Sequence, residues 1–403
     1  MIFFYDVLAK KEIQMKILYA ALVNEDSKPG YKIKVYSQCK AFENIGQECY
    51  LLILKQDGLC LYKFENHKAE IIKYYKIKGI SKEIAKEQIA CRKTFAEYIK
   101  KVTDEIMPDM VYIRRIIPLN PWIISTIKYI KREGINIAYE YPTYPWKSEL
   151  FLEKHYLIYL CDCFYYKRLI KMVDMVPYIG DYKGDKDKFI RTRNAVDIDF
   201  FNLKKSYPDK KSIDLISVSH AKPYHGHDRL IKGLYNYYHD TNIEPKMDVR
   251  FHIVGTVEKS LNLKKMTEGY DLQEKIIFHG FKTGADLDSV FDVADIGIDA
   301  IGKFRRKDCK TFSSSLKSRE YMARGLPIIV EKGIDFEVEN KADLDFVFRT
   351  DDNDTPVNIN EIVAWFNRIK STNEDIREFA KIFLSWEKEM GKVISFFNEY
   401  IKL

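Results

Sequence analysis

Three charged residues stand on one predicted helix late in the sequence, and the N-terminus of that helix could bind an anion. Lys317, Glu320 and Arg324 follow a serine-rich turn, and Gly325 ends the helix just before the apolar run 326–330. Serine before a helix and glycine after it are typical capping residues. A helix N-terminus presents unpaired backbone N–H groups and partial positive charge, so it binds anions, most often phosphate. The pattern predicts a site for a nucleotide-type ligand.

A second segment with chemical potential is 217–231, which follows a predicted strand and begins a predicted helix. Such loops carry binding residues more often than the elements they connect. Histidine can donate a hydrogen bond to phosphate, but it adds charge near pH 7 only when protonated. The lysine and arginine of the segment, together with Lys317, are therefore expected to supply the charge. The alternative is a surface turn without a specific role. The candidate contacts in this segment are His220, Lys222, His225 and Arg229.

Polar and aromatic residues also follow two predicted strands of the first half. Glu140 comes at the end of the run 135–139, and Arg114 and Arg115 come at the end of the run 110–113. Because ligands bind at the carboxyl ends of parallel strands, Glu140 is predicted to face a cleft, where its carboxylate could be catalytic. An arginine there could meet a phosphate or a carboxylate. The alternative for the aromatic tract 138–146 is structural packing.

Composition limits the class of protein. The chain has 403 residues, 46% of them hydrophobic and 14% aromatic, which is enough for two packed domains of ordinary size. A net charge of +7, from 66 basic and 59 acidic side chains spread along the chain, does not indicate a nucleic-acid partner. The longest apolar runs are too short to span a bilayer. Seven scattered cysteines without a CxxC pair predict reduced thiols in a cytoplasmic protein, and no metal site is expected.

The elements that must position these residues alternate between apolar strands and amphipathic helices. This alternation predicts a parallel sheet with helices on both faces, built twice, so that the loops of two doubly wound domains line one cleft. In the first half we expect strands at 15–20, 50–54, 110–113 and 135–139, and helices at 34–45, 82–107 and 121–133. In the second half we expect strands at 213–218, 249–254, 275–278, 296–300 and 326–330, and helices at 228–238 and 316–324.

Several of these segments resemble the GT-B glycosyltransferases, specifically the retaining family 4 (group 1) type. In that family a glutamate, matched by Glu320, precedes a small-Gly-x-Pro-apolar run and holds the nucleotide ribose. The family's first acid of the Glu-x7-Glu pair is replaced here by Phe312, and the arginine and lysine that contact the donor diphosphate are replaced by His220 and His225. Residues 194–197 are similar to the family's Asn-Gly-Val-Asp turn before the interdomain linker, where Asp197 is expected to be structural.

The resemblance extends into the first half. Residues 140–145 are similar to the Glu-x-Pro-Thr-Tyr-Pro signature of bacterial polysaccharide-assembling glycosyltransferases, which implies an acceptor subsite that uses aromatic rings. Gly30 and Tyr31 stand where the family has a glycine loop that approaches the donor. The donor contacts expected from all these segments are Gly30, Tyr31, His220, Lys222, His225, Arg229, Ser315 and Lys317. The expected acceptor contacts are Arg114, Tyr141, Thr143 and Tyr144, and the expected catalytic acids are Glu140 and Glu320.

The resemblance implies a α/β protein with two Rossmann-like domains facing across a cleft. The expected divisions are an N-terminal extension at 1–14, an acceptor-side domain at 15–199, a nucleotide-sugar domain at 200–380 and a helix at 381–403 that crosses back to the first domain. The polar stretch 197–210 is the expected connector.

The implied activity is a metal-independent, retaining hexosyl transfer without a cofactor. The donor would be a UDP- or GDP-linked sugar and the acceptor a saccharide or lipid-linked saccharide, in cell-surface polysaccharide synthesis. The protein would be cytoplasmic, with peripheral contact at the inner membrane surface, which the aromatic and basic run 165–171 suits. Two alternatives stay open: a catalytically inactive carbohydrate-binding or scaffolding subunit, and a nucleotide-sugar epimerase.

Overall fold

The computed structural model divides the chain into two compact units. The first comprises Met1–Arg193 and Trp386–Leu403, and the second comprises Asn194–Ser385. The structure describes residues 14–24, 29–55, 57–77, 85–147, 150, 155–180, 187–205, 210–239, 247–306, 314–331, 333–336 and 344–400. The expected N-terminal extension, apart from its last residue, and Phe312 lie outside these residues.

The first unit is built on an eight-stranded sheet with the order β4-β3-β2-β1-β5-β6-β7-β8. The six strands from β2 to β8 in this order pair in parallel, and β3 and β4 extend the β2 edge antiparallel. The strands are β1 (Lys16–Asn24), β2 (Glu48–Lys55), β3 (Gly58–Glu65), β4 (Lys68–Lys76), β5 (Met110–Arg114), β6 (Asn136–Tyr144), β7 (Val176–Gly180) and β8 (Phe189–Thr192).

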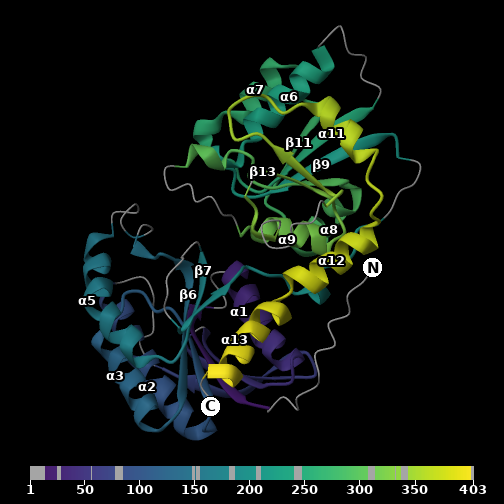
Figure 1. Cartoon of the computed structure of the whole chain (residues 1–403). Coiled ribbons are helices and arrows are strands. Elements are labelled where there is room, and N and C mark those ends of the chain that lie inside the picture. The colour runs from purple at the N-terminus through teal and green to yellow at the C-terminus, as the bar shows by residue number, and fades with distance from the viewer. Residues whose placement is uncertain are drawn as a thin grey trace. The chain divides into compact units, whose positions relative to one another are not determined.

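Helices cover both faces of this sheet (Figure 1). On one face the apolar sides of three helices pack on the strands, and on the other the first helix packs beside the last helix of the chain. The first three are α2 (Ala85–Ile106), α3 (Pro121–Arg132) and α5 (Tyr156–Met172), and the other two are α1 (Pro29–Asn44) and α13 (Trp386–Tyr400). Helix α13 also packs on β8.

The β3–β4 hairpin was not predicted. Its two-residue turn is Asn66-His67, and both residues have positive φ, of 52° and 62°. This is the backbone of a type I′ turn, whose twist matches that of the flanking strands. The pairing of Glu65 with Lys68 fixes the register of the hairpin. An Asn-x pair between two runs of apolar and charged residues was the available signal.

The second unit carries a six-stranded sheet with the order β11-β10-β9-β12-β13-β14, and all its pairs are parallel. In order along the chain this is 3-2-1-4-5-6, the order of a dinucleotide-binding Rossmann sheet, which reverses between β9 and β12. The strands are β9 (Ser212–Val218), β10 (Asp248–Val254), β11 (Ile276–Gly280), β12 (Ile296–Ile298), β13 (Ile328–Glu331) and β14 (Val347–Thr350).

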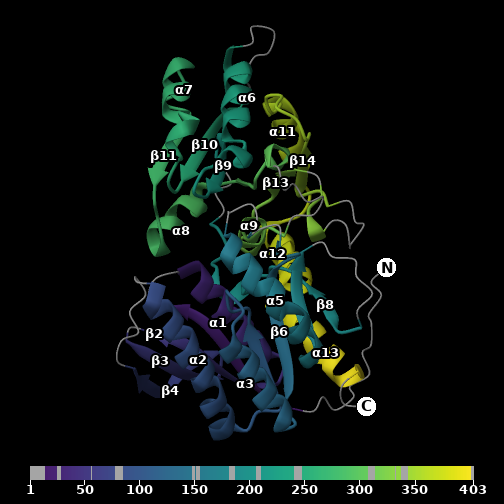
Figure 2. The same ribbon diagram turned by 90° about the vertical axis from the view of Figure 1, so that its left-hand side faces the viewer.

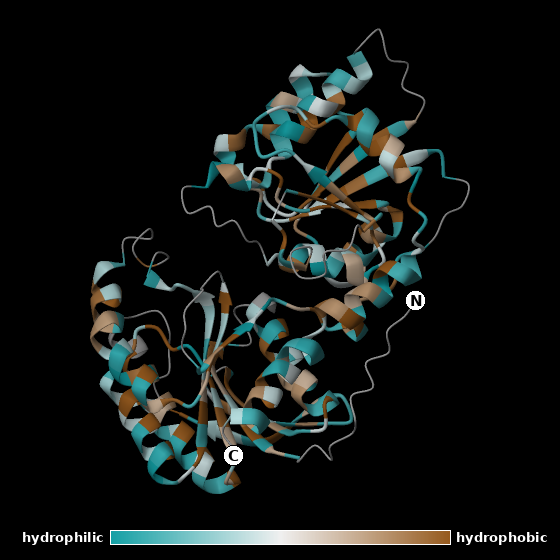
Figure 3. Cartoon of the chain, viewed as in Figure 1, coloured by the Kyte–Doolittle hydropathy of each residue, from teal (hydrophilic) through white to brown (hydrophobic). Residues whose placement is uncertain are grey.

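Helices cover both faces of the second sheet, and the apolar residues of the strands lie between the two helical layers (Figures 2 and 3). One layer contains α6 (His227–His239), α7 (Leu263–Gly269) and α11 (Ile359–Phe366). The other contains α8 (Gly284–Val293), α9 (Leu316–Ala323) and α12 (Asn373–Leu384). The predicted fold class, an α/β protein with two parallel-sheet Rossmann-like domains, is therefore confirmed.

Two predicted loops are regular structure. Gly30 and Tyr31 lie in the first turn of α1, because the helix starts at Pro29, which suits a first turn since proline lacks the N–H that would be unpaired there. The tract that follows residue 139 continues as strand β6 to Tyr144, so Glu140 lies within a strand. Among the described residues, no helix has the length and apolar character needed to cross a membrane.

Candidate functional site

The second unit brings several predicted site residues together where its strand order reverses. The loop after β9 leads through a short 3-10 turn (Pro223–His225) into α6, and the loop after β12 leads towards α9. Strands β9 and β12 are neighbours, and their connections lead in opposite directions along the sheet. In doubly wound sheets, ligands bind beyond the carboxyl ends of such a pair of strands. His225 comes from the first loop, and Ser315 and Lys317 come from the N-terminus of α9.

Asp299, one residue past the end of β12, organises this point. Its buried carboxylate accepts hydrogen bonds from the hydroxyls of Ser315 and Ser318, each at 2.8 Å. The ammonium groups of Lys303 and Lys317 each lie 3.5 Å from its oxygens. We call these five residues the Asp299 cluster. Burial would raise the pKa of the Asp299 carboxyl, but the two lysines and the two serine hydroxyls hold it well below its usual range.

The Asp299 cluster leaves the first turn of α9 without a side-chain cap. Ser315 is the N-cap residue, yet its hydroxyl contacts Asp299, so it does not accept a bond from the first-turn amides. The Lys317 nitrogen is buried and pairs with Asp299 by charge, without a well-directed hydrogen bond. Burial lowers the pKa of Lys317, and Asp299 only partly offsets this. A phosphate oxygen would therefore satisfy donors that the protein leaves poorly satisfied.

His225 is held beside the Asp299 cluster by its own loop. The backbone N–H of Lys222 donates to Nδ1 of His225 at 2.9 Å, so in the neutral ring the proton is on Nε2. Gly226 follows with φ of 71°, and a Cβ there would lie 2.9 Å from the carbonyl carbon of Ile301. Only glycine allows this loop to pass so close to the loop after β12. The imidazole Nε2–H is thus a fixed hydrogen-bond donor.

Burial, and then the nearby charge of Lys317, lowers the pKa of His225 to about 3. His227, the first residue of α6, is also buried, and its pKa is lowered for the same two reasons. Its Nε2 lies 3.0 Å from the Ser217 hydroxyl. Both rings are therefore neutral near pH 7 and add no positive charge to the site, which leaves that task to the lysines.

This arrangement predicts acid sensitivity of the second unit. The pKa of His225 is below its unfolded value of about 6.5, so its contribution to stability is complete above about pH 6.5 and is lost as the pH falls towards 3. Between pH 7 and pH 4.5, the His225→Gln variant should lose less unfolding free energy than the wild type. Urea denaturation at the two pH values measures the difference. Equal losses in both proteins would contradict the prediction, and His239→Gln, an exposed change on α6, is the control.

The structure takes Arg229 away from the predicted donor contacts. Its buried guanidinium donates to the backbone carbonyls of Thr355, Ile301 and Asp351. These three hydrogen bonds link α6 to the neighbouring loops. That is a structural task, and sequence alone could not show it because the partners lie 72 to 126 residues away. The prediction that Arg229 grips the ligand is therefore corrected.

His220 and Lys222 are exposed on the loop after β9. The Nδ1 atom of His220 lies 2.5 Å from the Thr256 hydroxyl. Glu320, on α9, is partly exposed and lies 3.3 Å from the guanidinium of Arg324. Burial raises the pKa of Glu320, and Arg324 offsets this only in part.

In the first unit, Glu140 has no exposed surface, which corrects the prediction that it faces a cleft. Its carboxylate accepts from Arg114 at 3.0 Å, from the Tyr19 hydroxyl at 3.1 Å and from Gln38 at 3.1 Å. Burial would raise the pKa of Glu140, but Arg114 and Lys34 and the hydrogen bonds lower it below its ordinary value. A buried, fully bonded carboxylate fixes Arg114 at the end of β5 and is not placed to attack a substrate.

The aromatic tract is part of the core of the first unit. Tyr141 and Tyr144 are buried, their rings are 5.5 Å apart, and the Tyr144 and Tyr166 hydroxyls are 2.5 Å apart. Rings packed in this way do not present a face to a sugar, which corrects the prediction of stacking by these two residues. Thr143 is partly exposed. Tyr31 is 51% exposed, and the Arg114 guanidinium lies 5.9 Å from its ring centre.

Sequence reasoning missed Asp299 and Lys303. The available signal was an acid directly after the short apolar run 296–298, since polar residues at the carboxyl end of a buried strand commonly serve a site. Lys303 begins another 3-10 turn (Lys303–Arg305), whose first two N–H groups donate to the carboxylate of Glu331 at 2.5 and 3.0 Å.

Two parallel-sheet Rossmann-like domains, with a charged cluster at the strand reversal of the second, define a doubly wound α/β protein. Residues 199–381, nearly the whole second unit, match the sequence model of the family described as glycosyl transferases group 1. The second unit is therefore similar in sequence to the group 1 glycosyl transferases over nearly its whole length. No curated protein matches the sequence.

Solved structures share the fold over both units. A glycosyltransferase from Rickettsia africae is similar with a TM-score of 0.61 and 14% identity, over 96% of this chain and 99% of that one. Sucrose-phosphate synthase from Thermosynechococcus elongatus has a TM-score of 0.59 and 11% identity, over 95% and 98%. Alr3699/HepE from Anabaena, in complex with UDP, has a TM-score of 0.57 and 13% identity, over 94% and 100%.

Proposed function

We propose that the protein transfers a hexosyl group from a nucleotide diphosphate sugar to a hydroxyl of a saccharide or lipid-linked saccharide, in the assembly of a cell-surface polysaccharide. The observation that carries the proposal is the uncapped first turn of α9, which contains Lys317 and lies beside the neutral His225 at the strand reversal of the second unit. A UDP- or GDP-linked donor suits this site, and the Anabaena structure similar in fold was solved with UDP.

In this proposal the diphosphate is the leaving group, and the site supports its departure. As the bond to the sugar breaks, negative charge grows on the diphosphate, where Lys317 and the first-turn N–H groups of α9 would stabilise it. His225 would donate its Nε2–H to an oxygen of the diphosphate or of the sugar. Glu320 would accept from the ribose hydroxyls, and its raised pKa does not prevent this because either protonation state can accept. Retention of configuration and independence of metal complete the proposal.

In the first unit we propose that Arg114, Tyr31 and Thr143 contribute to substrate binding, and that Glu140 acts by holding Arg114. Gly30 lies at the start of α1, next to Tyr31. His220 and Lys222 are exposed residues proposed to contact the donor in the second unit. The proposed place of action is the cytoplasm, at the membrane where a lipid-linked acceptor would lie.

Replacing Lys317 with alanine should weaken binding of a nucleoside diphosphate by at least about tenfold, because a hydrogen bond to a charged group contributes about 1.5–3 kcal/mol. Glu320→Ala should weaken the binding of nucleoside diphosphates but not the binding of inorganic pyrophosphate, which has no ribose. Titration calorimetry with UDP, GDP, ADP and pyrophosphate measures both effects. Lys265→Ala, an exposed change on α7, is the matched control. Unchanged affinity in Lys317→Ala would remove α9 from the proposed site.

One incubation distinguishes the proposed transfer from the two alternatives. Each of a panel of radiolabelled nucleotide sugars is supplied with and without lipid-linked acceptors, and the label is followed. Transfer to the acceptor supports the proposed function, whereas a new nucleotide sugar that differs at one centre supports an epimerase. Absence of nucleotide binding supports an inactive subunit, for which Phe312 in place of the family's acid is the motivating feature.

A further inference from the structure

Helix α5 carries an exposed apolar surface that the proposed transfer does not use. Leu157 is 80% exposed, Leu160 61% and Phe164 77%, and Tyr156 beside them is 51% exposed. At about 100° per residue, these side chains and the exposed Cys161 lie within one side of the helix. Single exposed apolar residues are ordinary, but a continuous run on one helix face marks an interaction site.

The opposite side of α5 fixes this orientation. Asp162 is buried, its carboxylate pairs with Arg115 at 2.6 Å, and it accepts from the backbone N–H of Leu119 at 2.6 Å. Leu169 and Ile170 pack in the core of the first unit. Because Asp162 lies about half a turn around the helix from the exposed leucines, the ion pair holds the apolar side outward.

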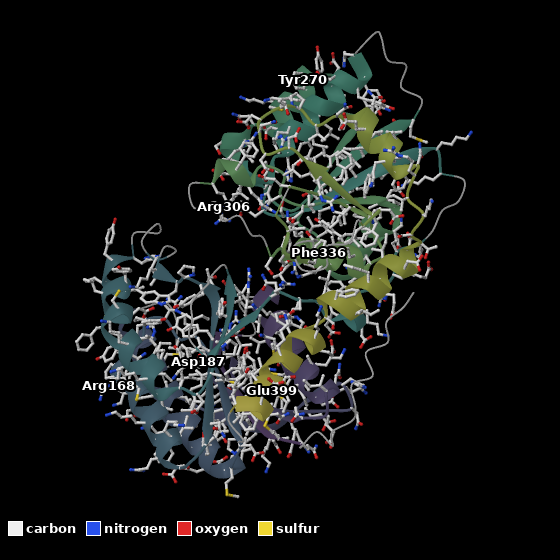
Figure 4. The ribbon with its side chains drawn as sticks, in the orientation of Figure 1. Arg168, Asp187, Tyr270, Arg306, Phe336 and Glu399 are labelled. Atoms are coloured by element: carbon white, nitrogen blue, oxygen red, sulfur yellow. The ribbon has the colours of Figure 1, made fainter. Side chains whose placement is uncertain are left out.

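Basic side chains continue the same exposed side towards the end of α5. Lys167, Arg168 and Lys171 are exposed, and Arg168 projects away from the sheet (Figure 4). Within the described parts of the chain, none of the three has an ion-pair partner, and the helix's one acidic residue is the buried Asp162. The outward face of α5 is therefore apolar in its first half and cationic in its second. In Figure 3 the outer side of α5 shows brown segments among teal ones.

We propose that this outward face of α5 docks the protein on an anionic lipid bilayer, with the helix lying in the plane of the interface. The four apolar side chains enter the headgroup and acyl boundary, and the three cations meet the anionic headgroups. About 21 Å of helix separate Leu157 from Lys171. A surface that contacts the apolar half and the cationic half of this face at once must therefore be broad and flat, as a bilayer is. A second copy of this chain fits less well, because a parallel pairing opposes like charges and an antiparallel pairing buries cations against leucines.

Sedimentation of the full chain with vesicles tests the proposal without any nucleotide sugar, so its result is independent of the proposed transfer. The vesicles contain phosphatidylcholine alone or phosphatidylcholine with phosphatidylglycerol, at low and high salt. One variant combines Leu157→Ser, Leu160→Ser and Phe164→Ser, and another combines Lys167→Gln, Arg168→Gln and Lys171→Gln. The controls are Phe281→Ser, which alters a residue 72% exposed in the second unit, and a triple change to glutamine of the exposed Lys259, Lys264 and Lys265.

The wild type should bind the vesicles that contain phosphatidylglycerol, and binding should fall with salt. The basic triple variant should lose about a hundredfold in partitioning and the apolar triple variant at least about tenfold, while both controls bind as the wild type does. Failure of the wild type to bind anionic vesicles at low salt overturns the proposal. So does equal loss in the controls, or a dimer in light scattering that the apolar variant dissociates while vesicle binding is unchanged.

Discussion

Replacing Glu140 with alanine should lower the free energy of unfolding of the first unit by about 3–5 kcal/mol, because it leaves the Arg114 charge buried without its partner. The Tyr19 hydroxyl and the Gln38 amide lose an acceptor at the same time. Denaturant unfolding, with hydrogen exchange of α1, β5 and β6 as the local readout, measures the loss. The second unit should keep its exchange pattern.

A double variant separates charge from packing. Glu140→Met with Arg114→Met replaces the buried pair by apolar side chains of similar size, and it should regain most of the lost stability. It should not regain transfer activity if Arg114 contacts the acceptor as proposed. Glu133→Ala, which removes an exposed carboxylate paired with Arg132 at 3.3 Å, should change stability by less than about 1 kcal/mol. If Glu140→Ala also lowered the free energy of unfolding by less than about 1 kcal/mol, the prediction that the buried pair stabilises the first unit would be wrong.

The Asp299→Ala variant should lose about 3–5 kcal/mol of stability in the second unit together with nucleoside diphosphate binding. Without the carboxylate, the largely buried Lys303 and Lys317 face each other uncompensated, and the first turn of α9 loses its two serine anchors. Thermal unfolding and calorimetric titration with UDP and GDP measure the two losses.

Adding Lys317→Met to Asp299→Ala should restore part of the stability but none of the binding, because it removes one uncompensated charge and also the proposed diphosphate contact. Asp286→Ala, an exposed acid in the first turn of α8, should cost at most about 1 kcal/mol and leave binding unchanged. Wild-type affinity in Asp299→Ala would move the anion site away from this cluster.

Local signals were sufficient for most elements of the second unit. Helix α9 was predicted at 316–324 and is observed at Leu316–Ala323, because a serine precedes it and Gly325, with φ of 78°, follows it. The alternation of apolar strands and amphipathic helices also fixed the parallel sheets, since a parallel pair requires a crossover helix. These features depend on neighbours in sequence.

The errors concern choices of distant partners. Arg229 was predicted to be a ligand contact because it follows a loop, but each of its three guanidinium nitrogens donates to a backbone carbonyl far along the chain. Glu140 was predicted to face a cleft because it ends an apolar run, but β6 continues past it and α1 covers it with Gln38. Burial of a polar group depends on which helix packs over it, and residue type does not reveal that.

The chain passes between the two units twice, after Arg193 and after Ser385, and these crossings lie side by side, since Val196 bridges to Ser385. The second unit is thus an insert whose two ends meet, a topology in which one module can be moved between hosts. A fragment of residues 194–385 is continuous and could be produced separately. The first unit cannot be obtained by C-terminal truncation, because a product ending at residue 385 would lack α13. It would also expose the side of α1 that packs on α13, where the Lys34 nitrogen lies 5.3 Å from the Trp386 ring centre.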